Sequence, residues 1–155
     1  MSTVAQLENL LDQELEIARA LASTLENERK ALVSDQAHAI ADIASNKAAL
    51  LERLEKLESQ RRNLVAQEQP QTEDDADALT RTMTGISSAV GRRWQSLMGL
   101  VAACRDANEA NGLIVNLRQG QVRQLLDIVR GNTAPVTYGP QGRTFAKAVR
   151  PLARA

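Results

Sequence analysis

Residues 76–130 contain no proline and place apolar side chains at an alternating spacing of three and four residues. This spacing puts the side chains on one stripe of an α-helix, so the segment predicts a single long helix from Ala76 to Arg130. The stripe consists of Leu79, Met83, Ile86, Val90, Leu97, Leu100, Cys104, Ala107, Ile114, Leu125 and Ile128. An apolar stripe of this length must be covered, which requires partner helices.

Two further helical patterns precede this segment. The first follows a capping residue, Ser2 or Thr3, and its apolar seam is Val4, Leu7, Leu11, Ala18, Leu21, Leu25 and Leu32. Ser34 and Asp35 are capping residue types and predict a reversal into a second helix, whose seam is Ile40, Ile43, Lys47, Leu50, Leu54, Leu57, Arg61 and Leu64. The polar residues on these seams, Glu14, Glu28, Lys47 and Arg61, are expected to reach water at the helix edges.

The predicted fold class is all-α: an antiparallel bundle of three long helices with the third helix overhanging, followed by an irregular tail. Residues 67–77 are polar and contain Pro70, so they predict the second turn, with Thr72 as the N-cap of the third helix. The first two helices have about thirty residues each and can cover only about as many residues of the third. The expected domains are a helical bundle, residues 1–131, and a flexible basic tail, residues 132–155.

The third helix also contains polar and small residues whose roles can be predicted. Gly85, Gly91 and Gly99 are expected where helices approach closely, because glycine is costly in a helix interior by roughly 1 kcal/mol. Asn108, Asn111 and Gly112 interrupt the apolar face. We expect the solid core to end there and the apolar residues beyond it to accept a partner or a fold-back of the chain.

Charge is divided between the halves of the chain. Residues 1–77 hold 8 Lys/Arg and 16 Asp/Glu, a net −8, and residues 78–155 hold 11 and 3, a net +8. The asymmetry favours antiparallel packing of acidic against basic helices. Nucleic-acid binding is not expected, because no nucleic-acid motif accompanies the arginines and the acidic half would repel phosphates.

No pattern in the sequence indicates catalysis, a metal or a cofactor. Cys104 lies on the apolar stripe and His38 stands alone, so neither suggests a nucleophile or a ligand. The acidic residues 73–75 lack the ligand spacing of an EF-hand. A basic and apolar leader and an apolar run of about 18 residues are both absent from the sequence, so we expect a cytoplasmic protein without stable membrane insertion.

Several segments of the chain resemble the FlgN-type flagellar export chaperones. Leu7 to Leu11, Leu25-Glu-Asn-Glu-Arg-Lys-Ala-Leu32, Asp35, Ile43, Lys47 and Leu50 to Leu64 resemble the amino-terminal helices of that family, and Asn108 to Ile114 and Tyr138-Gly-Pro-Gln-Gly142 resemble its carboxy-terminal half. The resemblance implies a chaperone that binds flagellar hook-associated proteins, shields their terminal helices and delivers them to the type III export apparatus.

The resemblance also implies that binding uses the carboxy-terminal helix and tail. The candidate partner-binding residues are Asn108, Asn111, Gly112, Leu113, Ile114, Leu117, Val122, Leu125, Val129 and Tyr138. The alternative is a coiled-coil scaffold that uses the same exposed stripe to form a homodimer and has no client.

Overall fold

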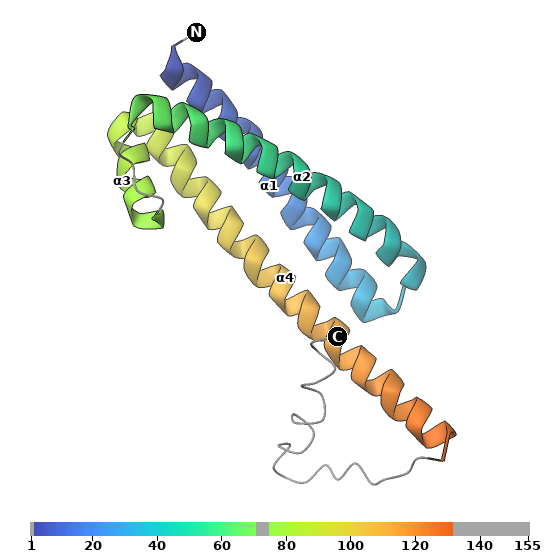
Figure 1. Cartoon of the computed structure of the whole chain (residues 1–155). Helices are drawn as coiled ribbons and strands as arrows, with labels where there is room; N and C mark the ends of the chain where they lie inside the picture. Colours follow the sequence, from blue (N-terminus) through green and yellow to red (C-terminus); the bar gives the residue numbers. More distant parts are fainter. Residues whose placement is uncertain (1, 71–74, 132–155) are drawn as a thin grey trace. The chain divides into compact units, whose positions relative to one another are not determined.

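The computed structural model describes residues 2–70 and 75–131, and every regular element in these ranges is an α-helix (Figure 1). The helices are α1 (Thr3–Ser34), α2 (Ala37–Glu68), α3 (Ala76–Ile86) and α4 (Ser88–Val129). The all-α class predicted from the sequence is therefore confirmed. The expected tail, residues 132–155, and the expected N-cap Thr72 lie outside the described residues.

The chain divides into two compact units, residues 1–111 and 112–155. The division falls at Gly112, the step at which the sequence predicts that the solid core ends. The overhang of the third helix and the domain boundary after residue 131 stay predictions. None of the described helices has the length and apolar content that crossing a membrane requires.

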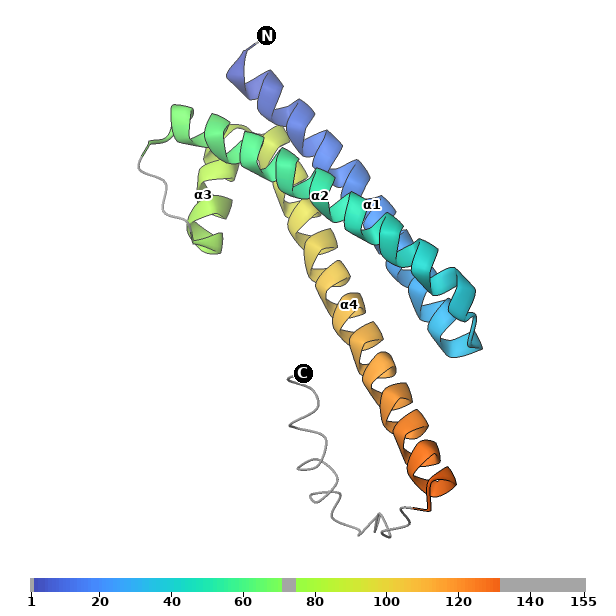
Figure 2. The same ribbon diagram turned by 45° about the vertical axis from the view of Figure 1, so that its right-hand side comes forward.

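Helices α1 and α2 lie side by side as an antiparallel hairpin (Figures 1 and 2). Helix α1 begins at the predicted cap, where the Ser2 hydroxyl accepts a hydrogen bond from the Ala5 N–H at 3.2 Å. It ends at Asp35, which adopts the left-handed conformation with φ 59° and donates its backbone N–H to the Ala31 carbonyl. The predicted reversal is thus confirmed.

The reversal does not use the Ser34 side chain as its cap. The Ser34 hydroxyl donates back to the Lys30 carbonyl within α1, at 2.7 Å. The residue that precedes α2 is Gln36, and its side chain makes no capping hydrogen bond. The backbone of Asp35, an acid that tolerates the left-handed region, therefore makes the turn.

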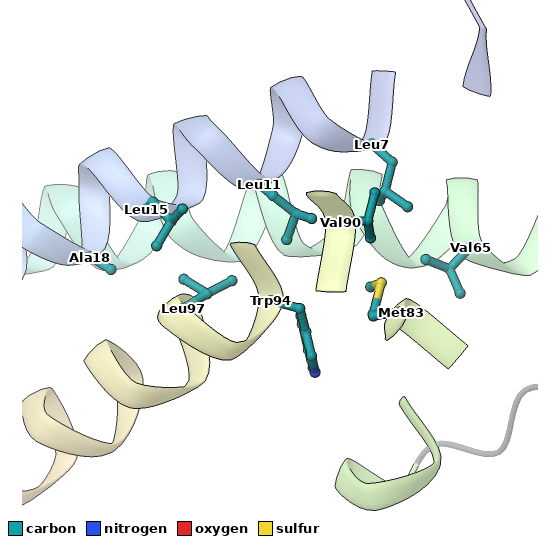
Figure 3. Packing of buried hydrophobic residues seen from close by; sticks show 9 residues of the cluster. All are labelled: Leu7, Leu11, Leu15, Ala18, Val65, Met83, Val90, Trp94 and Leu97. Carbon is teal, nitrogen blue, oxygen red and sulfur yellow. The ribbon is translucent and has the colours of Figure 1, made fainter. Parts of the chain in front are cut away.

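The main apolar cluster of the first unit joins all four helices (Figure 3). Its buried members are Leu7, Leu11, Leu15, Ala18, Val65, Met83, Val90, Trp94 and Leu97. A second cluster extends further along α1 and consists of Ile17, Leu21, Leu25, Leu50 and Cys104. The seam predicted for α1 therefore faces the core, and Cys104 is a core residue as predicted.

The predicted helix from Ala76 to Arg130 is interrupted at Ser87. This residue is extended, with φ −163° and ψ 159°, and separates α3 from α4. Its hydroxyl accepts a hydrogen bond from the Val90 N–H at 3.0 Å, so Ser87 caps the start of α4. The chain turns here, and Trp94 donates its indole N–H back to the Thr80 hydroxyl of α3 at 3.0 Å. The expectation of one continuous helix was wrong because a local cap and this contact favour a turn.

The turn gives a specific role to one of the three glycines expected at close approaches. A Cβ atom on Gly91 would lie 3.1 Å from the Cα of Thr84 in α3, tighter than nearly all real contacts of this kind. A Cβ on Gly85 or Gly99 would meet nothing within 4 Å. The prediction is therefore confirmed for Gly91 and wrong for Gly85 and Gly99.

A buried ion pair crosses the core between α1 and α2. Glu14 is 1% exposed and accepts two hydrogen bonds from Arg61 Nε, at 2.8 and 3.1 Å. The guanidinium of Arg61 also lies 4.7 Å from the centroid of the Trp94 ring. The expectation that Glu14 and Arg61 reach water was wrong, since each finds its partner inside the bundle. Burial raises the pKa of Glu14, and the charge and hydrogen bonds of Arg61 oppose that rise.

Candidate partner-binding segment

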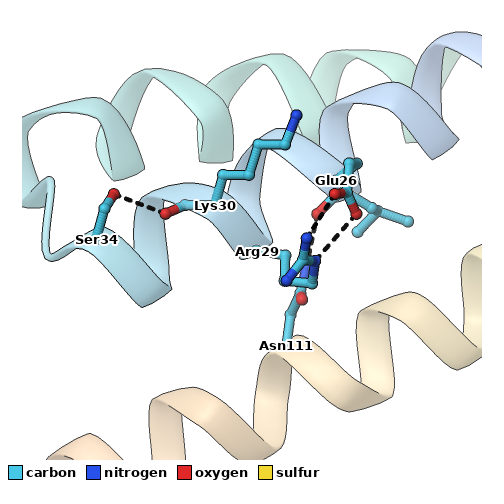
Figure 4. Close-up of polar contacts among 6 residues, drawn as sticks. Glu26, Arg29, Lys30, Ser34 and Asn111 are labelled. Carbon is cyan, nitrogen blue, oxygen red and sulfur yellow. Dashed lines mark hydrogen bonds and ion pairs between the residues drawn. The ribbon is translucent and has the colours of Figure 1, made fainter.

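The buried face of α4 ends at a polar network centred on Asn111. The Asn111 side chain is buried and donates to the Leu25 carbonyl at 3.0 Å and to Glu28 Oε1 at 2.8 Å. Figure 4 shows Asn111 pointing from α4 toward α1. Glu28 in turn binds Lys47 of α2 at 3.3 Å, so the network connects three helices. Glu28 and Lys47, both predicted to reach water, are half-buried here.

A polar residue in an apolar helix seam fixes the register of the helices, because a shift along the axis would leave it buried without partners. Asn111 satisfies this description, since it is buried on the α4 seam and its amide donates to two acceptors on α1. We infer that Asn111 acts within the bundle and fixes the register of α4 on α1.

Beyond Asn111, residues 112–131 form what we call the exposed segment, which is helical to Val129. All of its large apolar side chains except the half-buried Ile114 are exposed, from 37% for Val115 to 82% for Val129. The exposed ones are Leu113, Val115, Leu117, Val122, Leu125, Leu126, Ile128 and Val129. Elsewhere in the described residues only Val33 and Leu51 are exposed large apolar residues. Apolar exposure is thus concentrated in this segment, as expected for a surface that binds a partner.

The structure places the predicted site residues in different environments. Leu113, Leu117, Val122, Leu125 and Val129 are exposed in the exposed segment, with Gly112 at its start. Ile114 is half-buried, Asn108 is exposed on α4 within the first unit, and Asn111 is buried in the network described above. Tyr138 lies outside the described residues.

Three exposed apolar residues, Val115, Leu126 and Ile128, were not among the predicted site residues. Helix geometry could have found them. At about 100° per residue, the apolar residues of the exposed segment cover more than half of the helix circumference, and Asn116, Gln119, Arg123, Asp127 and Arg130 share the remaining face. This surface is wider than a single seam and can contact more than one partner helix.

The charged residues of the exposed segment are mostly cationic. The segment contains three arginines, Arg118, Arg123 and Arg130, and one acidic residue, Asp127, so its net charge is +2. Arg118 is half-buried and lies among apolar neighbours, since Val115 and Val122 are three residues before it and four after it. The other two arginines lie on the polar face.

The described residues offer no arrangement suited to nucleophilic or metal chemistry. No group of three or more His, Cys, Asp or Glu in this part of the chain could hold a metal ion. Cys104 is buried, its thiol lies 3.6 Å from the Ala18 carbonyl, and burial raises its pKa. A protonated thiol is a poor nucleophile, so we assign Cys104 to packing.

The order of the helices, the Asn111 step and the apolar segment that follows it agree with the resemblance seen in the sequence. The chain matches the FlgN protein family over residues 1–145. It belongs to the FlgN family. Two relatives are each 26% identical over 143 residues, covering 91% of this chain and 91% of their own: the Flagella synthesis protein FlgN of Salmonella typhimurium and that of Salmonella typhi. No solved structure shows a significant match to the chain.

Proposed function

We propose that this FlgN-family protein is a cytoplasmic type III export chaperone that binds flagellar hook-associated subunits through its carboxy-terminal helix and tail. The observation that supports the proposal is the exposed segment, which presents a wide apolar helical surface directly after the bundle core ends. The family membership and the names of the two relatives favour a client among flagellar proteins.

The proposed mechanism is helix addition. A client's amphipathic terminal helix lies along the exposed segment, so that apolar side chains of both partners leave water. Fully burying a Leu or Val side chain contributes roughly 1.5 to 3 kcal/mol, and several such residues are exposed here. Client helices that would otherwise associate prematurely are thereby covered until they reach the export apparatus.

The test is a double variant, Leu117→Ser with Leu125→Ser. The two side chains are 67% and 62% exposed, so their replacement should leave the helix content and the unfolding midpoint nearly unchanged. Affinity for a hook-associated subunit, measured by calorimetry, should fall by about two orders of magnitude or more, since two buried anchors are lost.

A matched control replaces Val33 and Leu51 by Ser, because these are exposed apolar residues outside the exposed segment. The control variant should bind the subunit as the parent does. Unchanged affinity in the Leu117 and Leu125 variant would remove these residues from the binding surface. A stable homodimer in sedimentation, with no binding to any hook-associated subunit, would favour the scaffold alternative.

A further inference from the structure

The part of α4 that packs in the bundle shows how wide a helix face its neighbours cover. At about 100° per residue, the buried and half-buried side chains of residues 100–111 span about 120° of the helix circumference. They are Leu100, Val101, Cys104, Ala107 and Asn111. Cys104 and Ala107 pack in the second cluster together with residues of α1 and α2. In this bundle, two neighbouring helices therefore cover a face of about 120°.

The apolar face of the exposed segment is nearly twice as wide. Counted in the same way, the apolar side chains from Leu113 to Val129 span about 220°. One partner helix covers no more than α1 and α2 cover together. A single client helix would therefore leave a large part of this apolar face in water.

The face divides into two stripes about 140° apart around the helix. The inner stripe continues the spacing of the buried Cys104 and Asn111 and consists of Val115, Val122, Leu125, Leu126 and Val129. The outer stripe consists of Leu113, Leu117 and Ile128, which are 60% to 67% exposed. The half-buried Ile114 lies between the stripes, Arg118 lies on the inner one, and Gln121 and Gln124 lie on the outer one.

The outer stripe has no apolar counterpart in the bundle part of α4. Steps of three and four residues back from Leu113 reach positions that are all exposed and small or polar. They are Ala110, Asp106, Ala103, Gly99 and Ser96. Large apolar side chains appear on this side of α4 only after Asn111. The outer stripe therefore serves a contact that the exposed segment makes and the bundle part of α4 does not.

We propose that the exposed segment binds two helices of one client subunit at the same time, one along the inner stripe and the other along the outer stripe. The inference rests on the proposed function, since the same segment is the client-binding surface, and it specifies the client as a pair of amphipathic helices. Joining the two helices in one chain makes the second association intramolecular, which strengthens binding. The net charge of +2 on the exposed segment favours acidic residues beside the apolar stripes of the client.

Two other occupants fit the stripes less well. A second copy of this chain offers one exposed segment, which covers one stripe and leaves the other in water. The tail, residues 132–155, is divided by Pro135, Pro140 and Pro151, and its longest stretch without proline has ten residues. A helix of ten residues is about 15 Å long, whereas residues 112–129 form a helix of about 27 Å. The tail is therefore too short to cover even one stripe as a helix.

The test counts bound helices. The probe is a synthetic amphipathic peptide of about three heptads with one leucine stripe and flanking glutamates, used where sedimentation shows it to be monomeric. At saturation, native mass spectrometry of the full chain should show two bound peptides. The inner variant, Val122→Gln with Leu125→Gln, and the outer variant, Leu117→Gln with Ile128→Gln, should each bind one.

The two variants are matched, because the four replaced side chains are 56% to 67% exposed and glutamine favours helix. Circular dichroism should therefore show unchanged helix content in both. The control variant, Val33→Gln with Leu51→Gln, replaces exposed apolar residues outside the exposed segment and should still bind two peptides.

A hook-associated subunit gives a second measurement. It should bind the parent chain one to one, and its affinity in calorimetry should fall at least about tenfold in the inner variant and also in the outer variant. The Leu117→Ser and Leu125→Ser variant removes one residue from each stripe, so it tests the whole surface and does not separate the stripes.

The proposal would be overturned by one bound peptide per parent chain, or by a second peptide that binds only after truncation at Asn132. Two subunits bound per chain, or a homodimer of the parent that either variant dissociates, would overturn it as well. If only one of the two variants lowered the subunit affinity, two-helix binding would be wrong and the proposed function would stand. If neither variant lowered it, the proposed function would fail too.

Discussion

Replacing Arg61 by Met should destabilise the bundle strongly. The substitution keeps a side chain of similar length but removes the donor of both hydrogen bonds to Glu14, at 2.8 and 3.1 Å. The carboxylate, 1% exposed, would stay buried without its cation. Breaking a buried pair in this way costs about 3–5 kcal/mol, a large part of the roughly 5–15 kcal/mol that typically stabilises a domain.

The double variant Glu14→Leu with Arg61→Met separates the pair from its parts. With both charges gone, neither a buried carboxylate nor a buried cation remains, and apolar replacement of such pairs is often neutral or stabilising. The double variant should therefore recover most of the stability that Arg61→Met loses. The loss of the contact between Arg61 and the Trp94 ring, at 4.7 Å, would leave a deficit of about 0.5–2 kcal/mol.

The pH dependence follows from the pKa of Glu14, which burial raises above its ordinary value of 4.5. A carboxyl whose pKa is higher in the folded state contributes stability that is complete below pH 4.5 and is lost as the pH rises through the folded pKa. Arg61 opposes this rise, so its removal should raise the pKa further. The difference in unfolding free energy between the parent and Arg61→Met should thus widen from pH 4.5 upward.

Urea unfolding followed by the emission of Trp94, the one tryptophan of the chain, measures these differences at the ion pair itself. Circular dichroism gives the helix content in parallel. If Arg61→Met lowered the free energy of unfolding by less than about 1 kcal/mol, the reasoning would be refuted, because a buried carboxylate without a partner destabilises a protein by more than that. The reasoning would also be refuted if the double variant were as unstable as Arg61→Met alone, because the loss of stability would then come from altered packing and not from the unpaired carboxylate.

Three further outcomes are expected. Gly99→Ala should stabilise the protein by about 1 kcal/mol in thermal unfolding, whereas Gly91→Ala should show no gain, because its Cβ would lie 3.1 Å from Thr84 Cα; equal gains would contradict the close approach. Cys104 should react slowly with a disulfide reagent until the protein is denatured, since its thiol is buried and its pKa is raised; rapid reaction in native buffer would contradict its core position. Truncation after Asn132 should leave the melting temperature within a few degrees, and a large decrease would show that the tail stabilises the bundle.

The helices of the hairpin were predictable because the spacing of apolar residues that specifies them is found within each segment of the sequence. The α1 seam repeats every three or four residues, and its buried residues could be read from that repeat without knowing the partner. The same holds for the exposed segment. Its apolar residues are too numerous for a single seam, and that excess is visible along the chain without reference to any contact between helices.

What could not be predicted depends on contacts between helices. The spacing places Glu14 and Arg61 on the seams of two helices. It does not predict that these two residues, 47 apart in sequence, form an ion pair with each other. The break at Ser87 was hidden because Ile86 and Val90 keep the four-residue spacing across it. The bond from Trp94 to Thr80, which holds the turn, exists only once α3 has folded back.

The same separation between local and distant contacts has a consequence for how the chain folds. Bonds within the hairpin and the α3–α4 turn join residues that are 14 to 47 apart in sequence, 14 for Trp94 and Thr80, 19 for Lys47 and Glu28, and 47 for Arg61 and Glu14. Asn111 and Leu25, in contrast, are 86 residues apart. Contacts that close long loops form late, so docking of α4 is expected to limit the folding rate. During synthesis the leucines of α1 therefore stay partly exposed until residues 88–111 of α4 have left the ribosome and can pack on them.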